Sequence, residues 1–135
     1  MDAALRTRLI DEHRSLDERF GRFLAAVTGG DAGAAAEAIR AFDDDLRRHT
    51  ALEEERLLPA PPDGRLAAAA DETPDERLSR ELRLEHVQVR ELSAMIRRLL
   101  EERADLAGAL RLAGNLARRW DAHTTREESE LLKPD

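Results

Sequence analysis

The 135-residue sequence has no cysteine and no tyrosine, and aromatic residues make up only 3% of it. Without cysteine, the chain cannot form disulfides, zinc–cysteine sites or iron–sulfur ligation, and thiol catalysis is excluded. No segment approaches the roughly 20 consecutive apolar residues of a membrane span. The N-terminal residues also lack the apolar block of a signal peptide. We therefore expect a cytoplasmic protein that does not associate with membranes.

Acidic residues outnumber basic ones by 29 to 22, which gives a formal net charge of -7. Nucleic acids are recognised by basic surfaces, so we do not expect a nucleic acid as partner. The chain is rich in Ala, Leu, Arg and Glu and poor in β-branched residues, a composition that favours helix over sheet. Its length suits a single domain spanning residues 1–135.

Three breaks in the apolar pattern divide the chain into four predicted helices. The first break is Gly29-Gly30-Asp31, and the second is the proline- and glycine-containing stretch 59–74, with a short helical turn expected at 66–70. A softer break lies at 104–108. Each segment between the breaks has apolar residues at steps of three or four, which predicts an all-α, antiparallel up-down-up-down four-helix bundle. The predicted helices span residues 3–28, 33–58, 75–103 and 105–132.

The apolar stripes of these helices carry unexpected polar residues. All four histidines of the sequence lie on a stripe, one in each predicted helix, and two glutamates lie there as well, each four residues after a histidine. A carboxylate rarely occupies a core position unless something compensates its charge. Residues four apart on a helix point in the same direction, so each HxxxE pair offers a nitrogen and a carboxylate to one volume. The candidate metal ligands are His13, His49, Glu53, His86, His123 and Glu127.

The two halves of the chain look like a duplication. His13 precedes His49 by 36 residues and His86 precedes His123 by 37, and the second histidine of each half begins an HxxxE pair. In an antiparallel bundle with a rise of 1.5 Å per residue, the four imidazoles then lie at a similar depth, roughly 15 Å from one end. We therefore predict that the four histidines meet in one layer.

Mixed imidazole and carboxylate ligation favours iron or manganese, and carboxylates can bridge two metal ions. Two octahedral ions offer twelve coordination positions. Four histidines, two bridging glutamates and one bridging oxygen would fill ten of them. The remaining two would accept dioxygen, peroxide, nitric oxide or water. We expect two iron ions with an oxo or hydroxo bridge, with manganese or zinc as substitutes.

The ordered pattern H…HxxxE…H…HxxxE, which runs from His13 to Glu127, resembles the hemerythrin-like or HHE cation-binding family. The resemblance implies a hemerythrin-like bundle with a non-haem di-iron centre, acting in oxygen binding, oxygen or redox sensing, iron handling or the response to nitric oxide. The chain differs from the oxygen-carrying hemerythrins at Arg90, where those proteins have a fifth histidine, and in ending on HxxxE instead of HxxxxD. The missing fifth histidine would leave one more coordination position open on the metal. This favours sensing, peroxide chemistry or iron handling over simple oxygen carriage.

Several functions stay open on this evidence. We favour a module that binds or senses dioxygen or a related small ligand, and the alternatives are an iron-handling protein, a di-iron enzyme acting on peroxide or nitric oxide, and a metal-free structural bundle. The expected partner is a diatomic molecule or peroxide. The chain would be a monomer or a homodimer, with leucine-rich faces around Leu92, Leu99 and Leu112 available for pairing.

Residues next to the candidate ligands each have two interpretations. Asp17 lies one turn after His13 and is more simply a partly exposed acid in a salt bridge than an additional ligand. Trp120 is a core residue that would also wall the metal cavity. Four glutamates adjoin a candidate ligand but lie ~100° around the helix from it, and we interpret them as solvated, with a hydrogen bond to an imidazole as the less favoured alternative. These are Glu12, Glu54, Glu85 and Glu128.

Overall fold

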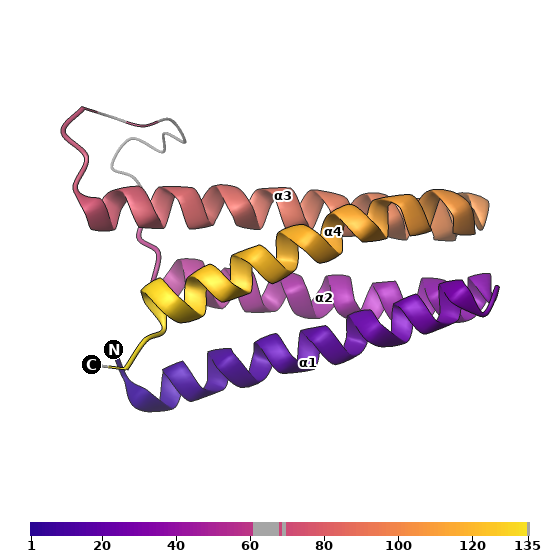
Figure 1. Cartoon of the computed structure of the whole chain (residues 1–135), viewed down its shortest axis with the longest axis horizontal. Coiled ribbons are helices and arrows are strands. Elements are labelled where there is room, and N and C mark those ends of the chain that lie inside the picture. Colours follow the sequence, from indigo (N-terminus) through magenta and orange to yellow (C-terminus); the bar gives the residue numbers. More distant parts are fainter. Residues whose placement is uncertain (61–67, 69, 135) are drawn as a thin grey trace.

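The computed structural model describes residues 1–60, 68 and 70–134, and its long helices run side by side along one axis (Figure 1). The described residues contain no strand, which confirms the predicted all-α four-helix bundle. The helices are α1 (Ala3–Thr28), α2 (Ala32–Arg56), α3 (Pro74–Arg103) and α4 (Leu106–Arg126), and a π-helical segment, η1 (Glu127–Leu131), continues α4.

Each helix begins at a side chain that accepts a hydrogen bond from a backbone N–H of the first turn. Asp2, Asp31, Thr73 and Asp105 fill this role, as expected for residues with short polar side chains. The turn between α1 and α2 needs a positive φ of 76° at Gly30, a conformation that glycine adopts without strain. The starts of the four helices and the first turn are therefore determined by local sequence.

The predicted boundaries of the first three helices agree with the structure to within two residues. The fourth prediction, an α-helix over 105–132, is wrong at its end, because the chain switches to π-helical hydrogen bonding at Glu127. The N–H of Leu132 donates to the carbonyl oxygen of Glu127 at 2.7 Å, five residues back. The helical turn expected at 66–70 falls mostly outside the described residues.

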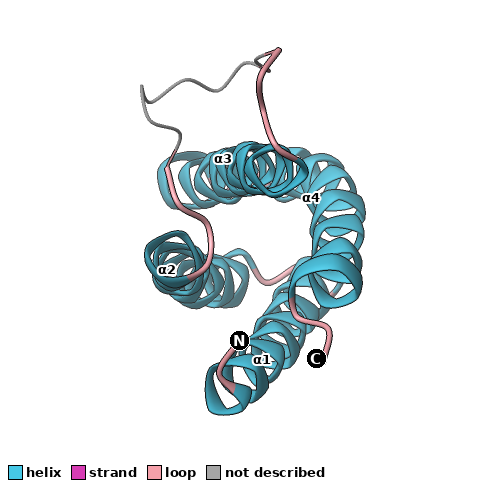
Figure 2. Cartoon of the chain, turned by 90° about the vertical axis from the view of Figure 1, so that its left-hand side faces the viewer, coloured by secondary structure: helices cyan, strands magenta, loops and turns pink. Residues whose placement is uncertain are grey.

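Viewed along the bundle, the helices surround a common interior in the cyclic order α1, α2, α3, α4 (Figure 2). The α1–α2 and α3–α4 turns lie at one end, and the described ends of the α2–α3 connection lie at the other end with both chain termini (Figure 1). Neighbouring helices are therefore antiparallel. None of the described helices has an apolar stretch long enough to cross a bilayer.

The apolar interior consists of two clusters with the histidine layer between them. The larger cluster includes Phe23, Phe42 and Leu116, and the smaller one joins Leu9 to Leu132 near the chain termini. Leu92, which we suggested as part of a dimer face, packs within the larger cluster and is only 9% exposed. That suggestion is wrong for Leu92, because its side chain points into the bundle.

Candidate metal centre

The structure brings all six candidate ligands together in the bundle interior, and each is at most 2% exposed. They form two groups of four, within each of which one ligand atom per residue lies within 4.8 Å of the others. Glu53 and Glu127 belong to both groups. The first group adds the histidines of α1 and α2, and the second adds those of α3 and α4. The groups are His13, His49, Glu53 and Glu127, and Glu53, His86, His123 and Glu127.

The two shared glutamates lie between the pairs of histidines. The Oε1 atom of Glu53 lies 3.2 Å from the Nε2 of His49 and 3.1 Å from the Nε2 of His86. Glu127 places its Oε1 atom 3.1 Å from the Nε2 of His13, and its Oε2 atom 3.1 Å from the Nε2 of His123. Each carboxylate therefore faces histidines of both groups, the arrangement needed to bridge two ions.

Most of these inward-facing atoms have no hydrogen-bond partner among the described residues. The unpartnered atoms are both carboxylate oxygens of Glu53, the Oε1 of Glu127 and the Nε2 atoms of three histidines. A buried polar atom without a partner costs about 1–3 kcal/mol. Two ligands that lie about 2.1 Å from one metal ion at right angles are about 3 Å apart, which is close to the contacts given above. The donor set therefore fits metal ions better than a network of hydrogen bonds.

The outward-facing nitrogen of every imidazole contacts a glutamate from another helix, and we name these four glutamates the glutamate ring. The Nδ1 of His49 (α2) lies 2.8 Å from Glu12 of α1, and the Nδ1 of His86 (α3) lies 2.9 Å from Glu54 of α2. The two remaining contacts continue the same order around the bundle and close it. They join His123 of α4 to Glu85 of α3 at 2.7 Å, and His13 of α1 to Glu128 of η1 at 2.8 Å.

Our interpretation of Glu12, Glu54, Glu85 and Glu128 as solvated residues is therefore wrong. The offset of ~100° turns each of them away from the bundle interior and toward the neighbouring helix, where it contacts a histidine. The repeated sequence carried a signal for this arrangement. A glutamate precedes the first histidine of each half, and another follows each HxxxE glutamate.

Arginines on the outside of the bundle hold three members of the glutamate ring. Arg8 donates to Glu12 at 2.9 Å, and Arg126 donates to Glu85 at 2.9 Å. Arg90 donates to Glu54 at 2.7 Å and also to Thr50 at 3.0 Å. Arg90 therefore occupies the outer layer and does not join either group of candidate ligands. Glu128, the most exposed member of the ring, has no arginine partner in the described part of the chain.

The first half of the chain matches a known protein family. The family model of the hemerythrin HHE cation binding domain covers residues 1–61, which include His13, His49 and Glu53. The resemblance to hemerythrin-like proteins is thereby confirmed over residues 1–61. Searches of the curated proteins and of the solved structures returned no match. The matched domain is a cation-binding one, and the two buried groups of histidine and glutamate could hold metal ions.

Trp120 covers one side of the candidate metal centre. Its ring centroid lies 5.7 Å from that of His13, 6.2 Å from that of His49 and 6.0 Å from that of His123. The indole N–H donates to Asp17 at 2.9 Å. Asp17 thus supports the tryptophan and is absent from both groups of candidate ligands. A buried aromatic wall restricts water at this side of the centre.

The electrostatics of the centre reflect close contacts between histidines and carboxylates. Burial lowers the pKa of His13, but the nearby carboxylates of Glu127 and Glu53 outweigh burial and raise it to about 10. The pKa of His86 is raised to about 10 for the same reasons. Burial raises the pKa of Glu53, and close contacts with the imidazoles of His13, His49 and His86 more than compensate and lower it to about 2. The carboxylates therefore stay ionised, as ligands must.

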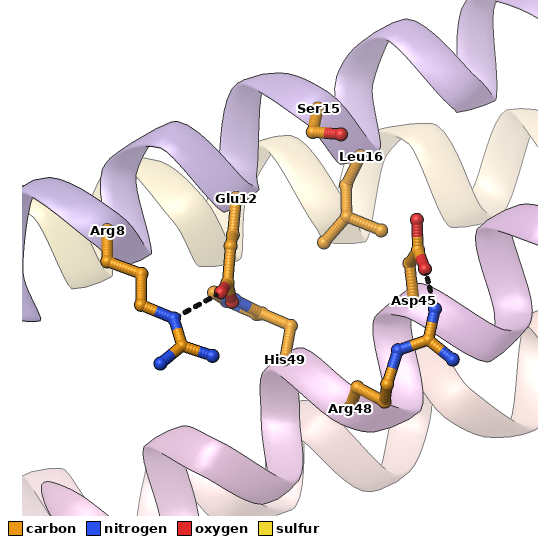
Figure 3. A pocket seen from close by; sticks show the side chains of 7 residues that line it. All are labelled: Arg8, Glu12, Ser15, Leu16, Asp45, Arg48 and His49. Carbon is orange, nitrogen blue, oxygen red and sulfur yellow. Dashed lines mark hydrogen bonds and ion pairs between the residues drawn. The ribbon is translucent and has the colours of Figure 1, made fainter.

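A surface pocket of about 230 Å³ lies between α1 and α2, outside the candidate metal centre. Figure 3 shows the ion pair of Arg8 with Glu12 toward one end of this pocket and that of Arg48 with Asp45 toward the other. His49 lines the pocket but is only 2% exposed. Solvent thus reaches the Glu12–His49 contact from outside, while the inward-facing nitrogen of His49 stays buried.

Proposed function

We propose that this hemerythrin-like chain is a non-haem di-iron protein that binds or senses dioxygen or a related small ligand at its metal centre. The observation that carries the proposal is the sharing of two fully buried glutamates, Glu53 and Glu127, between two groups of ligands. A shared carboxylate is the usual bridge between two metal ions. One ion would belong to each group.

The residues that would hold the ions follow from the two groups. His13 and His49 would bind the first ion through their Nε2 atoms, and His86 and His123 would bind the second. Glu53 and Glu127 would be common to both. Imidazole and carboxylate together suit iron and manganese, and a tetrahedral zinc ion would leave several of these ligands unused.

Bound iron would supply electron transfer and open coordination positions for a small ligand. The protein's own residues would then control which molecules reach those positions. Trp120 lies against three of the histidines and limits water on its side. Residue 90 is an arginine in place of a fifth histidine, and Thr50 and Glu54 hold it outward. It would therefore leave a coordination position of the metal open. These features favour binding of a small, weakly polar molecule.

Two further functions are compatible with the same ligand set: iron handling, and an enzymatic reaction with peroxide or nitric oxide. A single series of measurements separates them. The chain is loaded with ferrous iron under argon, its iron content is measured, and visible spectra are recorded under argon, then with oxygen, then with peroxide. A reversible new band under oxygen supports binding. Consumption of peroxide with turnover supports an enzyme. Iron that is taken up and released without either response supports iron handling.

A pair of variants provides the control for this series. Glu53→Gln removes the charge of a shared ligand, and Glu55→Gln makes the same change at an exposed neighbour. We expect about two iron ions per chain in the original protein and in Glu55→Gln, and fewer than two in Glu53→Gln. A colourless protein that takes up no iron in any form would contradict the proposal and favour a metal-free structural bundle.

A further inference from the structure

We propose that the glutamate ring, Glu12, Glu54, Glu85 and Glu128, positions the four imidazoles so that all of them bind metal through Nε2. The inference rests on the proposed function, since it concerns how the ligands are held. It assigns to four residues outside the ligand set the role of positioning residues. Without the ring, each imidazole would be free to rotate or to present its other nitrogen.

The first argument is the tautomer that each contact selects. A neutral imidazole has one N–H donor and one acceptor nitrogen, and an ionised carboxylate can only accept. Each Nδ1 atom lies 2.7–2.9 Å from a ring carboxylate, so Nδ1 carries the hydrogen and donates it. In the neutral imidazole the lone pair is then left on Nε2, which lies beside Glu53 in His49 and His86 and beside Glu127 in His13 and His123.

The second argument is the closed order of the contacts. Each glutamate reaches from its own helix to a histidine on the next helix, so one contact crosses each of the four seams of the bundle. The same order occurs at the α1–α2 and α3–α4 seams, where Glu12 and Glu85 hold the histidines of the two HxxxE pairs. The orientation of the imidazoles is thereby tied to the packing of all four helices.

The third argument is that the members of the ring are held to different degrees. Glu54 is held by two arginines, Arg83 at 3.2 Å and Arg90 at 2.7 Å, and its side chain is 20% exposed. The side chain of Glu128 is 43% exposed, and among the described residues its one ion-pair partner is His13. We therefore expect graded effects, with the largest from the braced members and the smallest from Glu128.

The α3 helix offers a matched pair of residues for the test. Glu85 and Glu81 lie one turn apart, their side chains are 28% and 30% exposed, and both pair with Arg126. Only Glu85 contacts a histidine, His123. Affinity for Zn²⁺ is measured by competition with a chelator. We expect Glu85→Ala to weaken it about 10- to 100-fold and Glu81→Ala to change it less than about twofold. Glu85→Gln keeps a carbonyl acceptor and should recover most of the loss.

A spectroscopic measurement separates positioning from general stability. In the Zn²⁺-loaded protein, long-range proton–nitrogen correlation spectra identify which imidazole nitrogen carries hydrogen. We expect Nδ1–H for all four histidines, and in Glu85→Ala a change at His123 with the signals of His13 retained. Circular dichroism checks that each variant folds. If Glu85→Ala does not fold, Glu128→Ala against Glu130→Ala takes its place, with an expected loss near the lower end of the range.

Equal zinc affinity in Glu85→Ala and Glu81→Ala, or an unchanged His123 signal in Glu85→Ala, would overturn the positioning role. Failure of the proposed function has a different signature, because the original protein itself would then bind no iron. A protein that binds two ions but is insensitive to the ring variants keeps the proposed function and loses this inference.

Discussion

The indole N–H of Trp120 donates to the Oδ1 atom of Asp17 at 2.9 Å, and this bond joins α4 to α1 beside the histidine layer. The same indole meets the His13 ring at an interplanar angle of 85° and the His49 ring at 80°. Trp120 is therefore held in place by a partly buried hydrogen bond while its ring contacts the candidate ligands.

Because Trp120 is the only tryptophan of the chain, its fluorescence reports on the centre without labelling. Ferrous or cobalt ions bound by His13 and His49 would quench it by energy or electron transfer over a short distance. Zinc has a filled d shell and should quench much less. We expect a titration with Co²⁺ that levels off near two ions per chain. Equal quenching of free tryptophan and of the protein at the same metal concentration would contradict a site beside Trp120.

Metal uptake should release protons, because the pKa values of His13 and His86 are raised to about 10 in the metal-free protein. At pH 7 both imidazoles are protonated, and a metal ion can bind Nε2 only after that proton leaves. We expect at least two protons per chain on loading, measured with a pH indicator in weak buffer. The apparent affinity should rise about tenfold per pH unit for each proton released. Uptake without proton release would count against these imidazoles as ligands.

Metal affinity should rise with pH, whereas the stability of the metal-free protein should fall as the pH rises above neutrality. A histidine whose folded pKa is about 10 stabilises the fold fully below its unfolded pKa of 6.5, and this contribution is lost as the pH rises toward 10. Glu53, whose pKa is lowered to about 2, stabilises the fold above 4.5 and loses this effect in acid. The Tm of the metal-free chain should therefore fall from pH 6.5 to 9, and the gap to the metal-loaded chain should widen.

A buried acid away from the centre supports the fold and not the metal. Asp43 is 1% exposed, accepts a hydrogen bond from Ser93 at 2.8 Å and pairs with Arg97 at 3.0 Å. Asp43→Ala would leave the buried Ser93 hydroxyl without its acceptor, and we expect a loss of about 2–3 kcal/mol in the free energy of unfolding. The iron content should not change, because Asp43 lies six residues before His49, about 9 Å along the helix.

The neighbouring residue Asp44 provides the control for this change. Its side chain is 48% exposed and pairs with the same Arg97 at 3.1 Å. Asp44→Ala should cost well under 1 kcal/mol in urea denaturation, as exposed ion pairs do. Equal losses in the two variants would show that burial of Asp43 does not determine its contribution.

Much of the fold and the inner layer of the centre could be predicted from the sequence, because both depend on spacing along a single helix. Because His49 and Glu53 lie four residues apart on one helix, their side chains point in the same direction regardless of how the neighbouring helices pack. The duplicated spacing likewise predicted that His13 and His86 would meet at the same depth. The structure agrees with these predictions at each position.

The outer layer could not be predicted in the same way, because it depends on how neighbouring helices face each other. Glu12 adjoins His13 in sequence but contacts His49, and Glu54 reaches His86 on α3. Arg97 of α3 likewise pairs with Asp43 of α2, a contact that spacing along a single helix does not predict. The π-helical hydrogen bonding that begins at Glu127 has no local sequence signal that separates it from an ordinary helix end.

The central claim is that two iron ions share Glu53 and Glu127 inside the bundle. The most direct test is a crystal structure of the chain loaded with iron under argon, with anomalous diffraction collected at the iron edge. The proposal predicts two anomalous peaks about 3.5–4 Å apart, one beside the Nε2 atoms of His13 and His49 and the other beside those of His86 and His123. A single peak, or none between the two pairs of histidines, would contradict it.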